Sequence, residues 1–319
     1  MKFGLFAIGV GGAIVIGLVA WFGVQSIGAE VLRAAWVIPL TTALLFVQLY
    51  LSAMAWRIAV GGKQPRVISY FHIRWIREAV NSLLPVAQLG GNLVGIRLLV
   101  LRGVPGPLAG AGTTLDLTIE VVTQFLFTLA GVGVLVSMGV DRAWAPWVEW
   151  ALVIAALALG GFIVAQRAGL LRLVEWLAAR LTRMFPALSL EAVRGLHAEL
   201  MRLQRDRAAL LQATALHLVA WTIGTAETWL VLTAMAQPIT LRQAFVIESL
   251  GMAIRSAGFA VPAALAVQEA GFIVVGGLFA VPPDTAIALS MVKRARELVV
   301  GVPGLVAWQW SEGRRLLRG

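Results

Sequence analysis

The sequence predicts an all-α fold, a polytopic bundle of transmembrane helices with about six full spans and two broken helical hairpins in an inverted repeat. Hydrophobic residues make up 60% of the chain and charged residues only 13%, whereas soluble domains carry roughly a quarter charged residues. The apolar residues also gather in runs of about 20, the length that crosses a bilayer as a helix. We therefore expect a single membrane domain over residues 1–319.

Six of these runs are expected to be full spans. The first has no charge after Lys2 and is too long for the core of a signal peptide, so we expect it to be retained. The last has charged residues at its middle. In order, the runs are residues 3–24, residues 34–56, a long run ending at Val140, residues 150–166, residues 208–235 and residues 286–310.

Basic residues beside apolar spans indicate the cytoplasmic side of a membrane protein. They crowd residues 167–207, the C-terminal tail and the loop predicted after the second span, which holds Arg57, Lys63, Arg66, Arg74 and Arg77. All three regions face one side if both termini are cytoplasmic. We expect a multi-pass protein of the bacterial inner membrane in that orientation, with basic residues that anchor it and no nucleic acid as partner.

Residues 167–207 are polar enough to lie outside the bilayer. Pro186 divides two helical patterns, and the second places Val193, Leu196, Leu200 and Leu203 on one face. This pattern predicts an amphipathic helical hairpin at the cytoplasmic surface, a connector attracted to anionic headgroups.

Two further apolar stretches, residues 79–96 and 256–277, are interrupted midway by proline, glycine and polar side chains. Freed backbone groups in a membrane must be satisfied by protein or by a water-filled cavity. We interpret both stretches as re-entrant hairpins or discontinuous helices, although either alone fits an ordinary kinked helix equally well.

A shift of 177 residues aligns these two stretches without a gap. Pro85 falls on Pro262, Val104-Pro105 on Val281-Pro282, and Glu120 on Glu297. Three predicted crossings separate the copies, so the second enters from the opposite face. An inverted repeat with paired broken helices is typical of alternating-access transporters and places the binding site near the midplane. The repeat halves are about residues 70–140 and 245–310.

Charged side chains inside the apolar runs are costly, so they should face the protein interior and pair. Asp116 and Glu120 share a helix face, and Lys293 and Glu297 occupy the matching positions of the repeat. We hypothesise an ion pair between Asp116 and Lys293, serving either function or helix packing. The candidate coupling network is Asp116, Glu120, Lys293, Arg294, Arg296 and Glu297.

Polar residues of the broken stretches form the candidate substrate site. Arg77 and Arg255 precede the two prolines, where basic groups suit a phosphate or another anionic headgroup. Arg77 also fits a cytoplasmic anchor. The candidate binding residues are Arg77, Gln88, Asn92, Arg255, Gln268 and Glu269.

Several kinds of chemistry are not expected. The chain has no cysteine and three histidines, which argues against thiol catalysis, iron–sulfur clusters and metal centres. It lacks the G-x-x-x-x-G-K-[ST] phosphate loop and the common hydrolase motifs. We expect no cofactor, no metal and no catalytic residue, and therefore not an enzyme.

Two blocks resemble the hopanoid-biosynthesis-associated membrane proteins, which are related to the membrane flippase domain of lysylphosphatidylglycerol synthases. They contain WIREAVNSLLPVAQLGGNLVGIRLLVLRGVPGP and ESLGMAIRSAGFAVPAALAVQEAGFIVVGGLFAVPPD. The resemblance implies translocation of a hopanoid or another polar-headed lipid across the inner membrane, with lipid-synthesis or export proteins as partners. Aminoacylation is not expected, because the chain ends nine residues after Trp310.

Two other functions stay open at this point. An integral-membrane transferase acting on a lipid would need an embedded acid–base group, for which Glu269 or Asp116 is a candidate. A non-catalytic scaffold for lipid-synthesis enzymes would use the intramembrane charges only to hold helices together. The sequence leaves the oligomeric state open.

Overall fold

The computed structural model describes residues 16–17, 19–61, 65–84, 90–139, 157, 160, 190–257 and 266–316, and their regular structure is entirely helical. The elements are α2 (Val24–Ala34), η1 (Ala35–Val37), α3 (Ile38–Val60), α4 (Val67–Leu83), α5 (Gly90–Val100), α6 (Gly106–Ser137), α9 (Leu190–Leu203), α10 (Arg207–Ala234), α11 (Leu241–Ala257), α12 (Val267–Gly277) and α13 (Pro283–Leu316).

Three of the described helical stretches are long and apolar enough to cross a membrane, namely the run Val24–Val60 and helices α6 and α10. They contain three of the predicted spans, and the predicted all-α membrane fold is confirmed. The predicted span 286–310 lies in α13, a single helix with charges near its middle. Residues 3–24 and 150–166 fall mostly outside the described residues, so the count of six spans stays a prediction.

Local chemistry explains where several helices begin and end. Pro39 stands in the first turn of α3, where its missing N–H costs nothing, and Gly61 ends that helix with a φ of 62°. Pro105 and Pro107 likewise mark the start of α6. Asp206 caps α10 by accepting a hydrogen bond from the backbone N–H of Ala209 at 3.0 Å.

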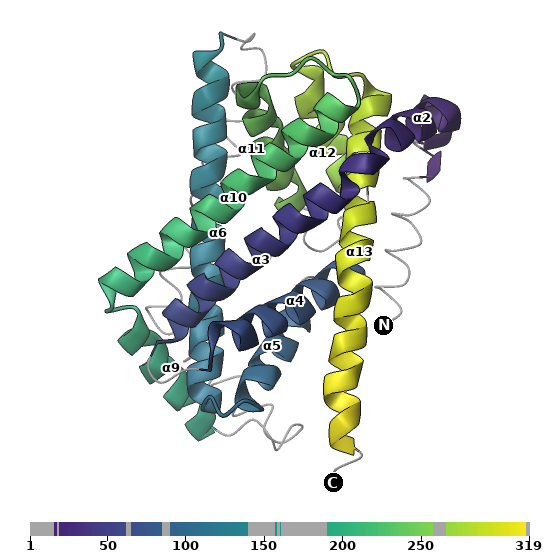
Figure 1. Cartoon of the computed structure of the whole chain (residues 1–319). Helices are drawn as coiled ribbons and strands as arrows, with labels where there is room; N and C mark the ends of the chain where they lie inside the picture. The colour runs from purple at the N-terminus through teal and green to yellow at the C-terminus, as the bar shows by residue number, and fades with distance from the viewer. Residues whose placement is uncertain are drawn as a thin grey trace.

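Helices α3 and α10 lie side by side through the middle of the molecule, with α6 on one side and α13 on the other (Figure 1). The short helices α4 and α5 pack together at one end, and α11 and α12 pack together at the opposite end (Figure 1). Helices α6 and α13 run in opposite directions. Each packs on the short helices of the other half, α6 on α11 and α13 on α4.

Glycines permit these close crossings between the halves. A Cβ added to Gly131 of α6 would collide with the Ser249 side chain of α11, and one added to Gly304 of α13 would lie 2.7 Å from the Cβ of Ala79. The indole Nε1 of Trp75 also donates a hydrogen bond to the Val300 carbonyl at 2.8 Å. Small residues therefore bring α13 against α4, as is usual for packed membrane helices.

Both broken stretches contain a helix break where the sequence predicts one. Helix α4 ends at Leu83 before α5 begins at Gly90, and α11 ends at Ala257 before α12 begins at Val267. The prolines of both breaks lie outside the described residues. The bounds of α5 and α12 correspond residue for residue under the shift of 177, and so do the first residues of α6 and α13.

The amphipathic helix predicted after Pro186 is α9, but its apolar face does not turn to lipid headgroups. Leu200 and Leu203 are buried against Ala111 and Leu115 of α6, with 1% and 6% of their surfaces exposed. Residues 167–189, which include the first helix predicted for the hairpin, lie outside the described residues. Helix α9 thus packs its apolar face on α6, and the cytoplasmic hairpin stays a prediction.

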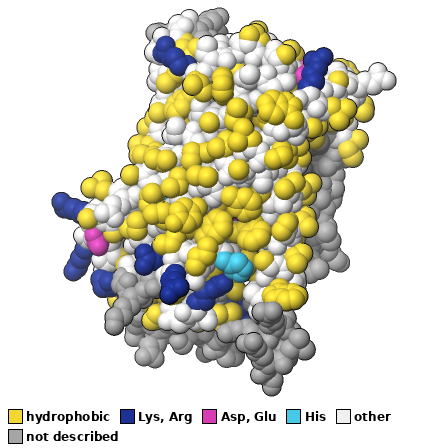
Figure 2. Space-filling view, in the orientation of Figure 1, with side chains coloured by type: hydrophobic (Ala, Val, Ile, Leu, Met, Phe, Trp, Pro, Cys, Tyr) yellow, Lys and Arg dark blue, Asp and Glu magenta, His cyan; other side chains and the backbone are white. Residues whose placement is uncertain are grey.

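Apolar side chains cover the middle of the face shown in Figure 2, and lysine and arginine side chains gather toward its two ends. Many large apolar residues stay exposed, including Trp21, Leu93, Leu211 and Val274. Such a surface suits contact with lipid acyl chains, with basic groups at the level of the headgroups.

Candidate functional site

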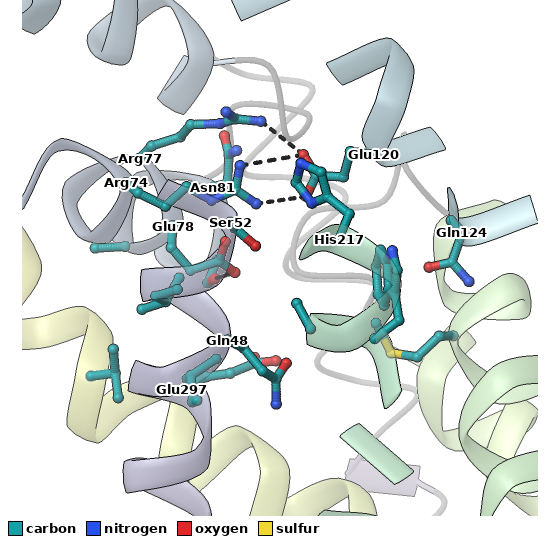
Figure 3. A pocket seen from close by; sticks show the side chains of 18 of the residues that line it. Gln48, Ser52, Arg74, Arg77, Glu78, Asn81, Glu120, Gln124, His217 and Glu297 are labelled. Carbon is teal, nitrogen blue, oxygen red and sulfur yellow. Dashed lines mark hydrogen bonds and ion pairs between the residues drawn. The ribbon is translucent and has the colours of Figure 1, made fainter. Parts of the chain in front are cut away.

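A cavity of about 520 Å³ lies between the two halves of the molecule. Helices α3, α4, α5, α6, α10, α11 and α13 all contribute to its wall, so both halves line it (Figure 3). The wall is rich in polar and charged groups, most of them from α4, α6, α11 and α13. These groups are Gln48, Ser52, Arg74, Arg77, Glu78, Asn81, Ser82, Asn92, Glu120, Gln124, His217, Arg255, Ser256, Arg296 and Glu297.

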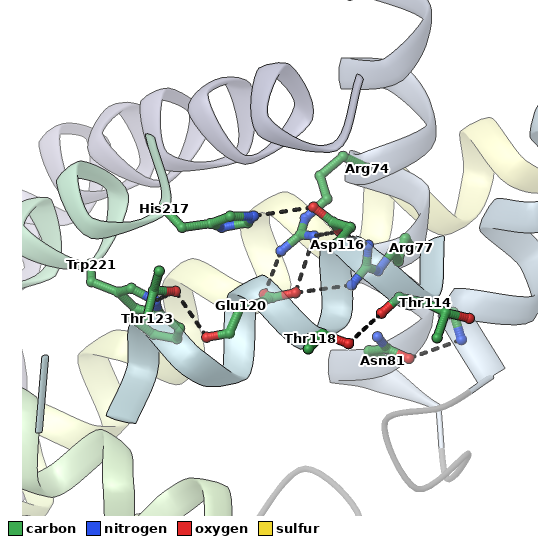
Figure 4. A network of polar contacts seen from close by, with 11 residues as sticks. Arg74, Arg77, Asn81, Thr114, Asp116, Thr118, Glu120, Thr123, His217 and Trp221 are labelled. Atoms are coloured by element: carbon green, nitrogen blue, oxygen red, sulfur yellow. Dashed lines mark hydrogen bonds and ion pairs between the residues drawn. The ribbon is translucent and has the colours of Figure 1, made fainter. Parts of the chain in front are cut away.

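The first charge cluster joins two arginines of α4 to two carboxylates of α6 (Figure 4). Arg77 donates to Asp116 at 2.7 Å and to Glu120 at 3.0 Å. Arg74 contacts the same two carboxylates at 3.3 Å and 2.6 Å. Asp116 is fully buried, whereas the Glu120 side chain is 24% exposed and reaches the cavity. We call Arg74, Arg77, Asp116 and Glu120 the first cluster.

Neighbouring helices hold the first cluster in place. The Nε2 atom of His217, on α10, lies 3.1 Å from the second oxygen of Asp116. The guanidinium of Arg77 stands 5.4 Å from the ring centre of Trp56, a cation–π contact. Gly95 leaves room for this stack, because a Cβ there would lie 3.1 Å from the Trp56 ring.

The second charge cluster, like the first, contains two cations and two carboxylates. Lys293 of α13 lies 2.8 Å from Glu248 of α11 and 3.8 Å from Glu227 of α10. Arg296 of α13 pairs with Glu227, and Thr228 donates a hydrogen bond to Glu248. All four charged side chains are at least 92% buried. We call Glu227, Glu248, Lys293 and Arg296 the second cluster.

Two more ion pairs lie beside these clusters. Arg255 of α11 pairs with Glu297 of α13 at 2.8 Å, on the cavity wall. Arg294 pairs with Glu269 of α12 at 2.8 Å, and Ser290 donates to the same Glu269 oxygen. Every one of these cations thus has a carboxylate partner, which offsets the cost of burying its charge in a low-dielectric interior.

A comparison with known protein families identifies the family of this chain. Residues 8–304 match the model described as the lysylphosphatidylglycerol synthase TM region. The chain belongs to this family. No curated protein and no solved structure matches the chain.

Three of the predicted binding residues of this family member line the cavity, namely Arg77, Asn92 and Arg255. Gln268 and Glu269 do not line it; both are fully buried and bonded to Ser290. Gln88 lies outside the described residues. Both halves therefore contribute predicted residues to the cavity wall, although α12 supplies none.

The predicted coupling network divides into separate groups. Asp116 and Glu120 belong to the first cluster, Lys293 and Arg296 to the second, whereas Glu297 pairs with Arg255 and Arg294 with Glu269. The hypothesised ion pair between Asp116 and Lys293 is absent from the structure, in which both residues are described. Asp116 faces α4 and α10 instead, and Lys293 faces α10 and α11.

Three ionisable residues of the cavity wall, Arg74, Glu78 and His217, were missed. Arg74 was assigned to a cytoplasmic loop together with Arg77, but both stand on α4 with 5% and 3% of their side chains exposed. Their spacing of three residues, which places both on one helix face, was the available signal. Glu78 carried no specific signal in the sequence, whereas His217 lies within the apolar run 208–235 and could have been recognised as an interior polar residue.

Proposed function

We propose that this protein moves a polar-headed lipid between the leaflets of the membrane. The polar headgroup would pass through the cavity while the acyl chains remain in the bilayer. The single observation that carries the proposal is the charged cavity that both halves of a membrane protein line together. Membership of a family defined on the transmembrane region of a lipid-modifying synthase supports a lipid as the substrate.

Arginines of the cavity are suited to a headgroup that carries phosphate. Arg77 and Arg255 each hold a carboxylate at about the distance that a phosphate oxygen would take, 2.7 Å and 2.8 Å. A phosphate can replace a carboxylate as partner of a guanidinium without leaving the cation bare. Exchange of partners would then open the ion pairs that connect helices across the cavity.

The opposite placement of the two short-helix pairs supports an alternating-access mechanism. Helices α4 and α5 lie at one end of the molecule and α11 and α12 at the other (Figure 1). We propose that the two halves act as an inverted repeat around the cavity, with re-entrant hairpins at its two ends. The sequence contains no phosphate loop for ATP, so the movement would be downhill or coupled to an ion gradient.

The proposed location is the bacterial inner membrane with both termini in the cytoplasm, which rests on the distribution of basic residues. A hopanoid is one proposed cargo and a phospholipid another; the sequence resemblance supports the first, and the arginines of the cavity support the second. Lipid-synthesis or export proteins remain the proposed partners.

The structure does not favour the transferase. Asp116 and Glu269, the two acid–base candidates, have no exposed surface and do not line the cavity. Each is engaged in an ion pair with arginine, Asp116 with Arg77 and Glu269 with Arg294. We therefore propose no chemical step for this chain.

The proposal is tested by reconstituting the purified protein into liposomes with a phospholipid that carries a fluorophore on one acyl chain. Dithionite added outside bleaches only the outer leaflet, so protein-dependent loss of the protected half of the signal reports exchange between leaflets. We expect exchange with the wild type and at least about a tenfold slower rate with Arg77→Gln. A hopanoid that carries the same fluorophore, tested in the same way, separates the two cargoes.

Arg33→Gln is the matched control, because Arg33 is 61% exposed and pairs only with the neighbouring Glu30. It should exchange lipid at the wild-type rate. A wild-type protein that folds but gives no exchange with either lipid contradicts the proposed function.

A further inference from the structure

The cavity reaches the surface of the molecule between α6 and α11. Among the described residues that line it, only Val121 of α6 and Ser256 of α11 are exposed, and Val121 has 48% of its surface exposed. Gln124 and Met252 line the cavity beside them on the same two helices. Figure 3 shows Gln124 on the side of the cavity away from Glu78 of α4. We call Val121, Gln124, Met252 and Ser256 the α6–α11 opening.

The equivalent crossing in the repeat, between α13 and α4, is closed. A Cβ added to Gly301 of α13 would lie 2.7 Å from the Leu83 side chain of α4. Ala79 of α4 also lines the cavity but is only 1% exposed. Under the shift of 177, Gly301 corresponds to Gln124 and Ala79 to Ser256. A glycine thus lets the two helices meet in one half, where the other half has the larger side chain of glutamine.

The depth of the α6–α11 opening in the membrane decides what can occupy it. Helix α6 is long and apolar enough to cross the bilayer, and Val121 stands near the middle of its 32 residues. A helix rises about 1.5 Å per residue, so the middle of a spanning helix lies in the hydrocarbon core. Acyl chains surround the protein at this depth, and water is excluded from it. The opening therefore suits an acyl chain.

Charged and apolar side chains adjoin at both edges of the opening. Glu120 directly precedes Val121 on α6, and its side chain is 24% exposed toward the cavity. Arg255 likewise precedes Ser256 on α11 and lines the cavity. Leu117, one helical turn before Val121, adds a second apolar side chain to the wall. Groups that suit a polar headgroup thus lie directly beside an apolar edge.

We propose that the α6–α11 opening is a lateral portal for a phospholipid, whose acyl chains pass through it into the bilayer while the headgroup occupies the cavity. The inference rests on the lipid movement proposed above and adds the route that the lipid takes. In this arrangement of the helices the lipid enters between α6 and α11, and the α13–α4 crossing is closed to it.

The first experiment obstructs the portal after the protein has folded. The chain has no cysteine, so Val121→Cys introduces a single thiol, which N-benzylmaleimide modifies in detergent before reconstitution. Lipid exchange in liposomes should then be at least about fivefold slower than with unmodified Val121→Cys, because the benzyl group takes the space of the acyl chains. An exchange rate that the modification leaves unchanged overturns the proposal.

Leu298→Cys, modified in the same way, is the matched control. Leu298 is equivalent to Val121 under the shift of 177 and is 53% exposed, but it does not line the cavity. Its modification should leave the exchange rate unchanged. Equal slowing at both positions would show that bulk anywhere on the lipid-facing surface is enough, and it would also overturn the portal.

The second experiment detects a lipid in the portal without transport. Two photoactivatable probes carry the same diazirine on one acyl chain; one is a phosphatidylglycerol and the other a diacylglycerol, which lacks the phosphate. After cross-linking in liposomes, mass spectrometry compares the labelling of residues 117–124 and 252–256 with labelling at Leu298. This ratio should be at least about threefold higher for phosphatidylglycerol, since only its headgroup can bind the arginines of the cavity. Equal ratios would indicate an ordinary lipid-facing surface and overturn the proposal.

The two experiments separate this inference from the proposed function. Headgroup-dependent labelling of the portal in a protein that exchanges no lipid retains the bound lipid and rejects the lipid movement. Exchange at an undiminished rate with modified Val121→Cys retains the lipid movement and rejects the portal. Variants are compared only when they elute as the wild type does from gel filtration, and Ser256→Cys serves if Val121→Cys does not fold.

Discussion

In the first cluster the cations stand on the short helix α4 and the carboxylates on the long helix α6, with Arg77 and Asp116 at its centre. In the second cluster the cations stand on the long helix α13 and the carboxylates on α10 and α11, with Lys293 and Glu248 at its centre. Asp116 and Lys293 are equivalent positions under the shift of 177. The two halves thus share this helix position and differ in the sign of the charge that stands there.

This inversion shows that each buried charge needs a partner of opposite sign close by. A buried ion pair persists only if its own surroundings complete it, since the partner has to lie within a few ångströms. Each half therefore compensates its charges locally and needs no pair across the repeat. The two clusters also differ in burial, because the Glu120 side chain is 24% exposed toward the cavity, whereas the second cluster reaches the wall only through Arg296, which is 8% exposed. The first cluster is open to a ligand; the second is a structural core.

The largest effect is expected from removal of one charge in the second cluster. Lys293→Met leaves the buried Glu248 without its cation, and such a change costs about 3–5 kcal/mol. Unfolding of the purified protein in detergent, followed by circular dichroism against temperature, measures the loss.

Glu248→Gln added to Lys293→Met is the control for this prediction. It removes the stranded charge and should recover about 1–3 kcal/mol of the loss. If Lys293→Met alone unfolds at the same temperature as the wild type, the second cluster is not a structural core. The contrast between the two clusters then fails.

A smaller effect is expected within the first cluster, where burial differs between two carboxylates that share the same arginines. Asp116 accepts from Arg74 and Arg77, contacts His217 and is fully buried. Asp116→Asn should therefore destabilise by about 2–4 kcal/mol and Glu120→Gln by about 1–2 kcal/mol, since water in the cavity can solvate the arginines freed by the second change. The same thermal unfolding measures both, and equal losses would show that exposure to the cavity does not matter.

Local signals were enough to predict the helix breaks and the intramembrane charges. Proline and glycine mark both breaks in the sequence, and the repeat predicts that their positions correspond under the shift of 177, as the bounds of α5 and α12 do. The cost of a charge in a membrane likewise identified Asp116 and Lys293 as interior residues. Their partners could not be predicted, because the choice depends on which helices meet. Asp116 turns to Arg77 of α4 and to His217 of α10.

Arg74 is a second residue whose contacts could not be predicted from the sequence. Five basic residues in one segment fit a cytoplasmic loop, and only the helix over Val67–Leu83 reveals that two of them point inward. The packing of α9 on α6 could not be predicted for the same reason, because leucines at helical spacing fit lipid and a neighbouring helix equally well.

The close packing between the halves predicts a further loss of stability. Gly131→Ala places a methyl group against Ser249 of α11 and should cost about 1–3 kcal/mol. Gly133→Ala, two residues away on the same helix, meets nothing within 4 Å and should be neutral or stabilising by up to about 1 kcal/mol. Thermal unfolding of the two variants side by side tests the crossing, and equal stabilities would contradict it.

The smallest effect is expected at an exposed ion pair whose geometry matches that of the second cluster. Arg33 and Glu30 lie 2.8 Å apart, the same distance as Lys293 and Glu248, but Arg33 is 61% exposed and Lys293 only 3%. Water solvates whatever charge remains after Arg33→Gln, so the loss should stay below about 0.5 kcal/mol. Compared with Lys293→Met under identical conditions, this variant separates burial from distance. A loss as large as that of Lys293→Met would mean that contact distance, and not enclosure, sets the contribution of these ion pairs.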